Sequence, residues 1–126
     1  MQTLRRAGTV IFVSTRSPEV TVAHDIEAAG VVMQWAPSIA AADGLLNSAR
    51  ERTVIVTELA LADGNWRDLV ERVRIRDVPI PIVLLTSAST AELWWDALEC
   101  GVDDILHAPL KASRLCRLLE MHFRSP

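Results

Sequence analysis

Cysteine is scarce in this chain, which has only Cys100 and Cys116. Both fall on stretches expected to be helical, they form no CxxC pair, and no histidine stands at metal-ligand spacing from them. The N-terminal residues from Met1 to Arg6 lack the apolar core of a secretory signal. We therefore expect reduced thiols in a reducing cytoplasm, with no disulfide and no metal site.

Positive charge and long apolar runs are also limited. The chain has 13 lysines and arginines against 16 acids, giving a net charge of −3, and Lys111 is its only lysine. The arginines are scattered and form no basic stripe, so the attraction that a phosphate backbone requires is weak. The apolar runs are far shorter than the roughly 20 residues of a membrane helix. We expect this segment to contact neither nucleic acid nor membrane.

Short apolar runs alternate with longer amphipathic stretches along the chain. Half of the 126 residues are apolar, which is enough for the core of a single domain, expected over residues 1–126 with its core from about 9 to 123. The runs predicted to be buried strands are Val10–Val13, Val31–Trp35, Val54–Val56, Ile82–Leu85 and Asp104–His107.

Helix signals lie between these runs. The predicted helices are Pro18 to Gly30 after a Ser17 cap, Ser38 to about Arg50, Trp66 to about Ile75, Thr90 to Cys100 after a Ser89 cap, and Lys111 to Phe123. Alternation of five strands with five helices requires parallel pairing with right-handed crossovers. The predicted fold class is therefore α/β, a three-layer doubly wound domain around a parallel five-stranded sheet.

In a sheet of this kind, ligands bind beyond the carboxyl ends of the strands. The residues that follow the predicted strands are the candidates for a site. They are Ser14, Thr15 and Arg16 after the first strand, Thr57 and Glu58 after the third, Thr86 and Ser87 after the fourth, and His107, Ala108 and Pro109 after the fifth.

Three stretches carry a resemblance to a known family. They are Leu59–Trp66, Pro81–Ser87 and Ala97–Leu110, and together they resemble the receiver domains of response regulators in two-component signalling. The resemblance covers the chain from about Thr9 to Phe123. It implies a flavodoxin-like receiver fold with strand order 2-1-3-4-5.

The positions that carry the chemistry of the receiver family are mostly changed here. The resemblance places Glu58 at the phosphate-accepting aspartate, Ser14, Thr15 and Arg16 at the lost acidic pair, Ala108 at the lost lysine, Ile105 at the switch aromatic and Thr86 at the retained switch hydroxyl. Because Mg²⁺ requires charged oxygen ligands, we expect no magnesium, no other metal and no cofactor. The resemblance is thus to a degenerate pseudo-receiver.

Glu58 and Arg16 carry opposite charges and are expected at the same edge of the sheet, so we consider an ion pair between them. Arg16 brings a permanent positive charge, which favours an anion over a dication at this site. An Arg16–Glu58 pair would replace the metal contact and hold the domain in one signalling state. In the alternative, Glu58 points into solvent. Lys111 is expected to be solvated rather than to supply the lost amine.

The tryptophans and histidines are expected in different environments, some in the core and some on the surface. Trp94 and Trp95 are adjacent on one predicted helix, so they cannot both lie on the buried stripe of Leu93, Ala97 and Leu98. At least one is expected to be exposed as a candidate interface residue. Trp35 and Trp66 are expected in the core or at its edge. The residues expected on the surface without a catalytic role are His24, His107 and His122.

The leading interpretation is a non-enzymatic signalling module that no longer accepts phosphate at the usual site and acts through protein contacts. Its partner would be another protein, an output domain or a second copy docked through the face from the fourth to the last helix. Two alternatives stay open. One is a receiver phosphorylated at Glu58; the other is a flavodoxin-like binder that holds a phosphate-bearing ligand on the hydroxyl-rich loop Ser14–Ser17.

Overall fold

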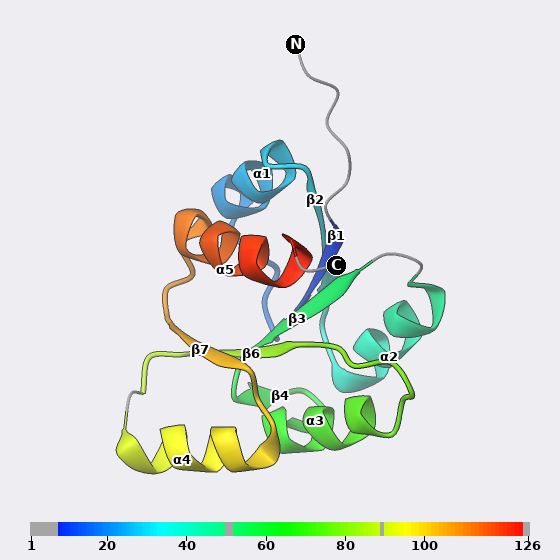
Figure 1. Cartoon of the computed structure of the whole chain (residues 1–126), viewed down its shortest axis with the longest axis vertical. Helices are drawn as coiled ribbons and strands as arrows, with labels where there is room; N and C mark the ends of the chain where they lie inside the picture. Colours follow the sequence, from blue (N-terminus) through cyan, green and yellow to red (C-terminus); the bar gives the residue numbers. More distant parts are fainter. Residues whose placement is uncertain (1–7, 50–51, 89, 125–126) are drawn as a thin grey trace.

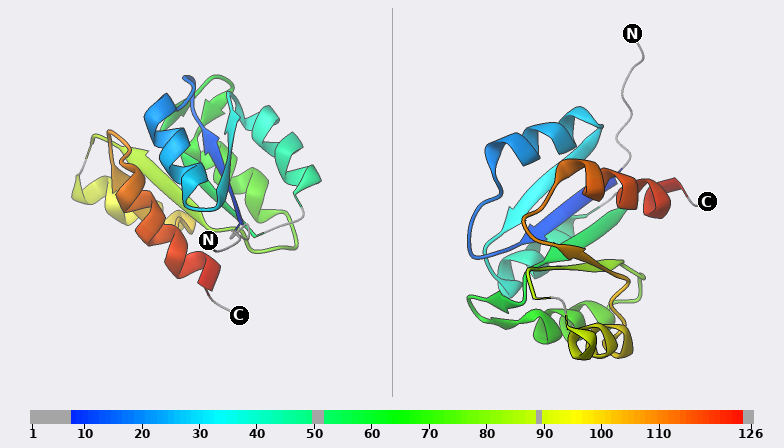
Figure 2. Two further views of the ribbon diagram at one scale, coloured as in Figure 1. Left: turned by 90° about the horizontal axis from the view of Figure 1, so that it is seen from above. Right: turned by 90° about the vertical axis from the view of Figure 1, so that its left-hand side faces the viewer.

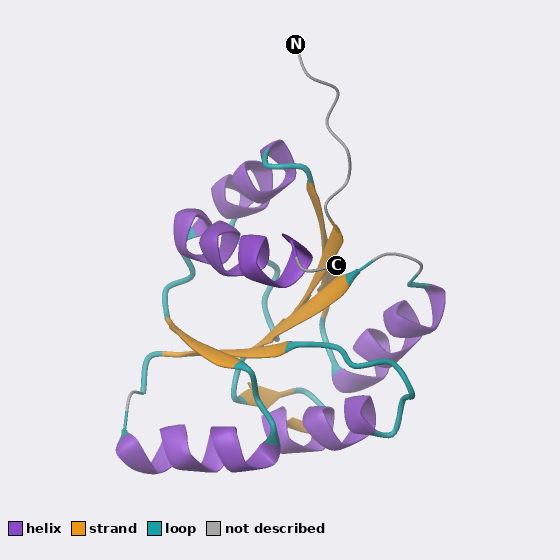
Figure 3. Ribbon diagram, viewed as in Figure 1, coloured by secondary structure: helices purple, strands orange, loops and turns teal. Residues whose placement is uncertain are grey.

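A parallel β-sheet forms the centre of the computed structural model, which describes residues 8–49, 52–88 and 90–124. The sheet has five strands in the order β2-β1-β3-β6-β7, and every neighbouring pair runs parallel (Figures 1 and 3). The strands are β1 Gly8–Val13, β2 Val31–Ala36, β3 Thr53–Thr57, β6 Ile82–Thr86 and β7 Asp104–His107. The predicted order 2-1-3-4-5 is confirmed, since β6 and β7 are the fourth and fifth strands of this sheet.

Helices cover both faces of the sheet, so the predicted three-layer architecture is also confirmed. The helices are α1 Val20–Ala28, α2 Ile39–Ser48, α3 Trp66–Arg74, α4 Ala91–Cys100 and α5 Ala112–Arg124. Helices α1 and α5 lie together on one face, and α2, α3 and α4 lie on the other (Figures 1 and 2).

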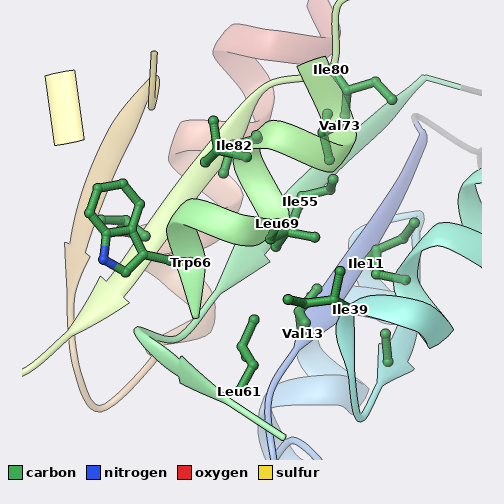
Figure 4. Close-up of a cluster of buried hydrophobic side chains, with 14 of the residues drawn as sticks. Ile11, Val13, Ile39, Ile55, Leu61, Trp66, Leu69, Val73, Ile80 and Ile82 are labelled. Carbon is green, nitrogen blue, oxygen red and sulfur yellow. The ribbon is translucent and has the colours of Figure 1, made fainter. Parts of the chain in front are cut away.

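Side chains of the central strands alternate between two apolar clusters. Ile11, Ile55 and Ile82 point to the face covered by α2, α3 and α4. There they form one cluster with Leu69 and Val73 of α3 (Figure 4). Their strand neighbours face the opposite way, and the cluster beneath α1 and α5 contains Val10, Phe12, Val54, Val56, Val83 and Leu85. Because both faces are covered, these strands need no polar side, which explains their uninterrupted apolar sequence.

Helix boundaries differ from prediction at α1. The helix begins at Val20 after Glu19, which makes no side-chain capping bond, and not at Pro18 after a Ser17 cap. The loop after β1 is thus longer than expected. At α4, Thr90 is the cap through its bond from the Leu93 amide, while the predicted cap Ser89 lies outside the described residues.

A short hairpin between β3 and α3 was not predicted. Strands β4 Ala60–Leu61 and β5 Gly64–Asn65 pair antiparallel across a tight turn. The turn residue Asp63 accepts hydrogen bonds from the amides of Ile39 at 2.8 Å and Ala40 at 3.0 Å, and these bonds lower the pKa of its carboxyl. Asp63 therefore joins the hairpin to the first turn of α2.

Within the described ranges, no helix combines the length and the apolar character that crossing a bilayer requires.

Candidate functional site

The candidate site lies at the carboxyl edge of the sheet, where the predicted residues meet. Val13 pairs with Thr57 at the last position of the β1–β3 ladder, and Ser14 and Glu58 follow directly. The Glu58 amide donates to the Val13 carbonyl at 3.1 Å, which continues the ladder beyond the strands. Two residues 44 positions apart in sequence are thereby held side by side.

Ser14 binds the Glu58 carboxylate. Its hydroxyl donates to Glu58 Oε1 at 2.7 Å and accepts from the Arg16 amide at 3.1 Å. Ser14 is only 1% exposed, so the hydroxyl is a fixed part of the site. A hydrogen bond to a charged acceptor is among the stronger ones in proteins. The serine therefore satisfies one oxygen of a partly buried carboxylate.

The proposed Arg16–Glu58 ion pair is wrong, because no such pair within 4.0 Å occurs in the part of the chain that the structure describes. Arg16 lies on an exposed loop, where its guanidinium stays hydrated, whereas Ser14 is already beside Glu58. A fully solvent-facing Glu58 is also wrong, since its side chain is partly buried and hydrogen-bonded. Thr15 is exposed and takes no part in these bonds.

Glu58 opens onto a cavity of about 260 Å³ between the loop before α1 and the loop before α5. The walls are mostly apolar and are formed by Phe12, Val22, Leu85, Ala108 and Leu110 with two prolines. The charged residues around it are one arginine, Arg16, and two glutamates, Glu19 and Glu58. Arg16 was expected to make this site favour an anion. Two acids and one base line the cavity, so its charges do not favour an anion.

Thr86 is buried, and its hydroxyl is engaged locally. The hydroxyl accepts from the Ala88 amide at 2.9 Å and also contacts the Ala88 carbonyl at 3.3 Å. The Thr86 carbonyl accepts from the Ala108 amide at 2.9 Å, which brings the methyl group of Ala108 to the cavity. Ile105 is partly buried against the cluster beneath α4. The switch positions thus make backbone and apolar contacts here.

Lys111 is exposed and lies outside the lining of the Glu58 cavity. It borders a separate hollow of about 270 Å³ with His107 and Arg114. His107 is exposed, as expected for a strand-end residue. His24 is exposed as well, and His122 is partly exposed on α5.

The donor set does not fit a magnesium ion. One carboxylate and one serine hydroxyl face each other at the site, and the hydroxyl is already bound to the carboxylate. No group of three or more histidine, cysteine or acidic side chains suited to a metal occurs among the residues described. A hard divalent cation requires several charged oxygens, which this edge does not offer.

Helix α4 exposes a band of apolar side chains. Trp94 is 41% exposed, Trp95 69% and Leu98 51%. The prediction of at least one exposed tryptophan is confirmed, but the prediction that Leu98 is buried is wrong. Only Ala97 of this helix is fully buried, because α4 rests on the sheet edge by a narrow stripe.

The other two tryptophans differ from each other. Trp66 is buried at the start of α3, as predicted. Trp35 is 43% exposed because β2 is an edge strand. It lies at the edge of the core rather than inside it, and its indole nitrogen donates to the Ser14 carbonyl at 2.9 Å. Trp35 thus supports the backbone of the site residue from the neighbouring strand.

The contact between Ser14 and Glu58 is not among the sequence predictions, which give Ser14 as a lost metal-ligand position and as part of an anion-binding loop. The available signal was its position, since residues that follow adjacent parallel strands lie next to each other.

Known proteins share this fold. The two-component response regulator from Clostridium difficile has a TM-score of 0.81 and 23% identity over 93% of this chain and 96% of its own. Vibrio cholerae chemotaxis protein CheY4 has a TM-score of 0.77 and 21% identity over 91% of this chain and 98% of its own. The resemblance to response-regulator receiver domains is confirmed at the level of the fold.

Sequence comparison gives one relative with higher identity over part of its length. The photosynthetic apparatus regulatory protein RegA of Cereibacter sphaeroides is 32% identical over 98 residues, which are 78% of this chain and 53% of that protein. The chain therefore spans about half the length of this curated relative. No family model matches the sequence.

Proposed function

We propose that this chain, which has the receiver fold of response regulators, is a signalling module that is not phosphorylated at the usual position and acts in the cytoplasm through protein contacts. The observation that carries the proposal is the 2.7 Å bond from Ser14 to Glu58. It places an internal donor on the carboxylate at the phosphate-accepting position. We assign no catalytic residue.

The surroundings of Glu58 support this proposal. Phosphoryl transfer depends on cations that neutralise developing charge on the phosphoryl oxygens. Here the donor set does not fit magnesium, Ala108 presents only a methyl group, and Lys111 lies outside the cavity. Thr86 is bound to the backbone of Ala88. These contacts favour a domain that keeps one state without an added phosphate.

Helix α4 supports a role in protein contacts. Trp94, Trp95 and Leu98 form an exposed apolar band, and tryptophan is enriched at the energetic centres of interfaces. Acidic residues on the same helix are Glu92, Glu99 and Asp96, which pairs with Arg67, and basic residues on α5 are Arg114 and Arg117, with Lys111 just before the helix. Opposite charges on the two helices suit a two-fold pairing of identical faces, in which each α4 meets the partner's α5.

A second copy is therefore the partner that we propose for this face. An output domain is a further possibility in a longer protein, because the chain spans about half of its curated relative.

The proposal is tested by amide NMR of the protein with and without Mg²⁺ and beryllofluoride, a mimic of an acyl phosphate. A receiver domain that retains its acids is treated in parallel as the positive control. We expect the positive control to shift and this chain to keep its spectrum. Shifts clustered at Glu58, Thr86 and Ala108 would instead establish the alternative of an atypical phosphate-accepting site.

A further inference from the structure

We infer that the cavity beside Glu58 is a binding site for an alkylammonium group, supplied by a small primary amine or by a lysine side chain of a partner. This binding site goes beyond the proposed signalling role. It rests on that proposal in one respect, because the Glu58 carboxylate can bind an ammonium group only if it holds no metal ion. The recognition elements are one carboxylate and an apolar cavity of about 260 Å³.

The carboxylate provides the charge. Ser14 occupies Oε1 of Glu58 at 2.7 Å, and the other oxygen, Oε2, accepts no hydrogen bond from any residue that the structure describes. Glu58 is partly buried, so water hydrates it less than it would a surface acid. A buried or partly buried charge without a partner is costly, and an incoming cation would remove that cost.

Neighbouring charges favour a cation over an anion. Arg16 and Glu19 also border the cavity, but both are exposed and solvated. Glu58 is the charged side chain that is partly withdrawn from water, and the Ser14 hydroxyl donates its hydrogen bond to it. The donors of Arg16 and Ser17, which also line the cavity, lie on the exposed loop, so an anionic ligand would face the partly buried carboxylate, whereas an ammonium group has three donors to offer it.

The walls determine the rest of the ligand. Phe12, Val22, Leu85 and Leu110 present apolar surface, and Ala108 leaves room where a longer side chain would enter. The volume is below the roughly 300–1,000 Å³ of pockets for drug-sized ligands, so the site suits a short chain. A linear alkyl group with a terminal ammonium matches both the apolar walls and the single charge.

The test is a titration of the protein with n-butylammonium chloride, followed by amide NMR. A ligand of about five non-hydrogen atoms is expected to bind with a Kd of about 1–10 mM. Shifts are expected at Ser14, Glu58, Ala108 and Leu110. Sodium chloride controls for ionic strength, and n-butanol provides the same apolar chain without charge. Equal binding of butanol, or shifts spread over surface acids, would overturn the inference.

Two variants separate the charge from the cavity. Glu58→Gln keeps an oxygen for the Ser14 hydroxyl but removes the charge, and it should weaken butylammonium binding at least about tenfold. Arg16→Ala removes an exposed competing cation and should strengthen binding by up to about fivefold. Because Arg16 is exposed, this variant stays informative even if Glu58→Gln folds poorly. Unchanged affinity in Arg16→Ala together with unchanged affinity in Glu58→Gln would reject the site.

A capped tripeptide with a central lysine distinguishes the two sources of the ammonium. If the peptide produces the same shifts as butylammonium, a lysine of a partner protein can enter; if only butylammonium does, the site takes free amines. Absence of binding by both would contradict the inference. The beryllofluoride experiment is done without amine, so failure of the proposed function and failure of this inference give different spectra.

Discussion

The Ser14 hydroxyl lies 2.7 Å from the Glu58 carboxylate, and each residue follows the last paired position of neighbouring strands β1 and β3. The carboxyl edge of the sheet is therefore bridged by a hydrogen bond between side chains. The bridge satisfies one oxygen of the Glu58 carboxylate, which still lines the adjoining cavity.

Ser14→Ala should destabilise the domain. The substitution leaves a partly buried carboxylate without its donor, and a loss of about 1–3 kcal/mol in the free energy of unfolding is expected. Urea denaturation measures it. Arg16→Ala is the matched comparison, because Arg16 is exposed and forms no pair with Glu58, and it should change stability by less than about 0.5 kcal/mol. Equal losses in both variants would contradict the assigned partner of Glu58.

Trp95→Ser should weaken self-association without unfolding the protein. Trp95 is 69% exposed, so little packing is lost, but a central interface tryptophan contributes about 2 kcal/mol or more to binding. Sedimentation velocity should show a dimerisation constant weakened about 30-fold. Val20→Ser on α1 is the control, since Val20 is an apolar residue that is 83% exposed on another face. If the wild type is monomeric at all concentrations, the proposed second copy is wrong.

Asp63→Asn should change how stability depends on pH. Hydrogen bonds from the Ile39 and Ala40 amides hold the pKa of Asp63 below its ordinary value of 3.8. The stabilisation is therefore complete above that value and is lost as pH falls through the lower pKa of the folded state. Urea midpoints of wild type and variant should differ most above about pH 4 and converge as the pH falls through the lower pKa of the folded state.

Asp77→Asn provides the control for that experiment, because Asp77 is exposed beyond the end of α3. A difference between Asp63→Asn and wild type that stays constant from neutral to acidic pH would show that the charge of Asp63 is not what stabilises the start of α2.

Two glycine substitutions should have opposite effects. A methyl group on Gly8 would lie 2.7 Å from the Arg52 carbonyl oxygen and from the Phe123 ring, so Gly8→Ala should cost about 1–3 kcal/mol. Gly44 lies in α2 with no atom within 4 Å of such a methyl group. Gly44→Ala should therefore stabilise the protein by about 0.5–1 kcal/mol. Thermal unfolding of both variants checks this, and similar melting temperatures would contradict it.

Local sequence determined the secondary structure and its order. Uninterrupted runs such as Val10–Val13 and Ile82–Leu85 are explained only by burial on both faces, and helices between them require parallel strands. That logic also located the edge of the sheet where Glu58, Thr86 and Ala108 gather. These conclusions depend on residues close together in the chain, which is why the sequence alone predicts them.

Tertiary structure decided which side chains meet and how much of each is exposed. Ser14 instead of Arg16 became the partner of Glu58, because strand pairing held the serine in place while the arginine remained in solvent. Exposure of Leu98 followed from the narrow contact of α4 with the sheet, and exposure of Trp35 from the edge position of β2. Sequence patterns specify a preferred environment for each residue, but a contact between distant residues depends on the packing of the whole fold.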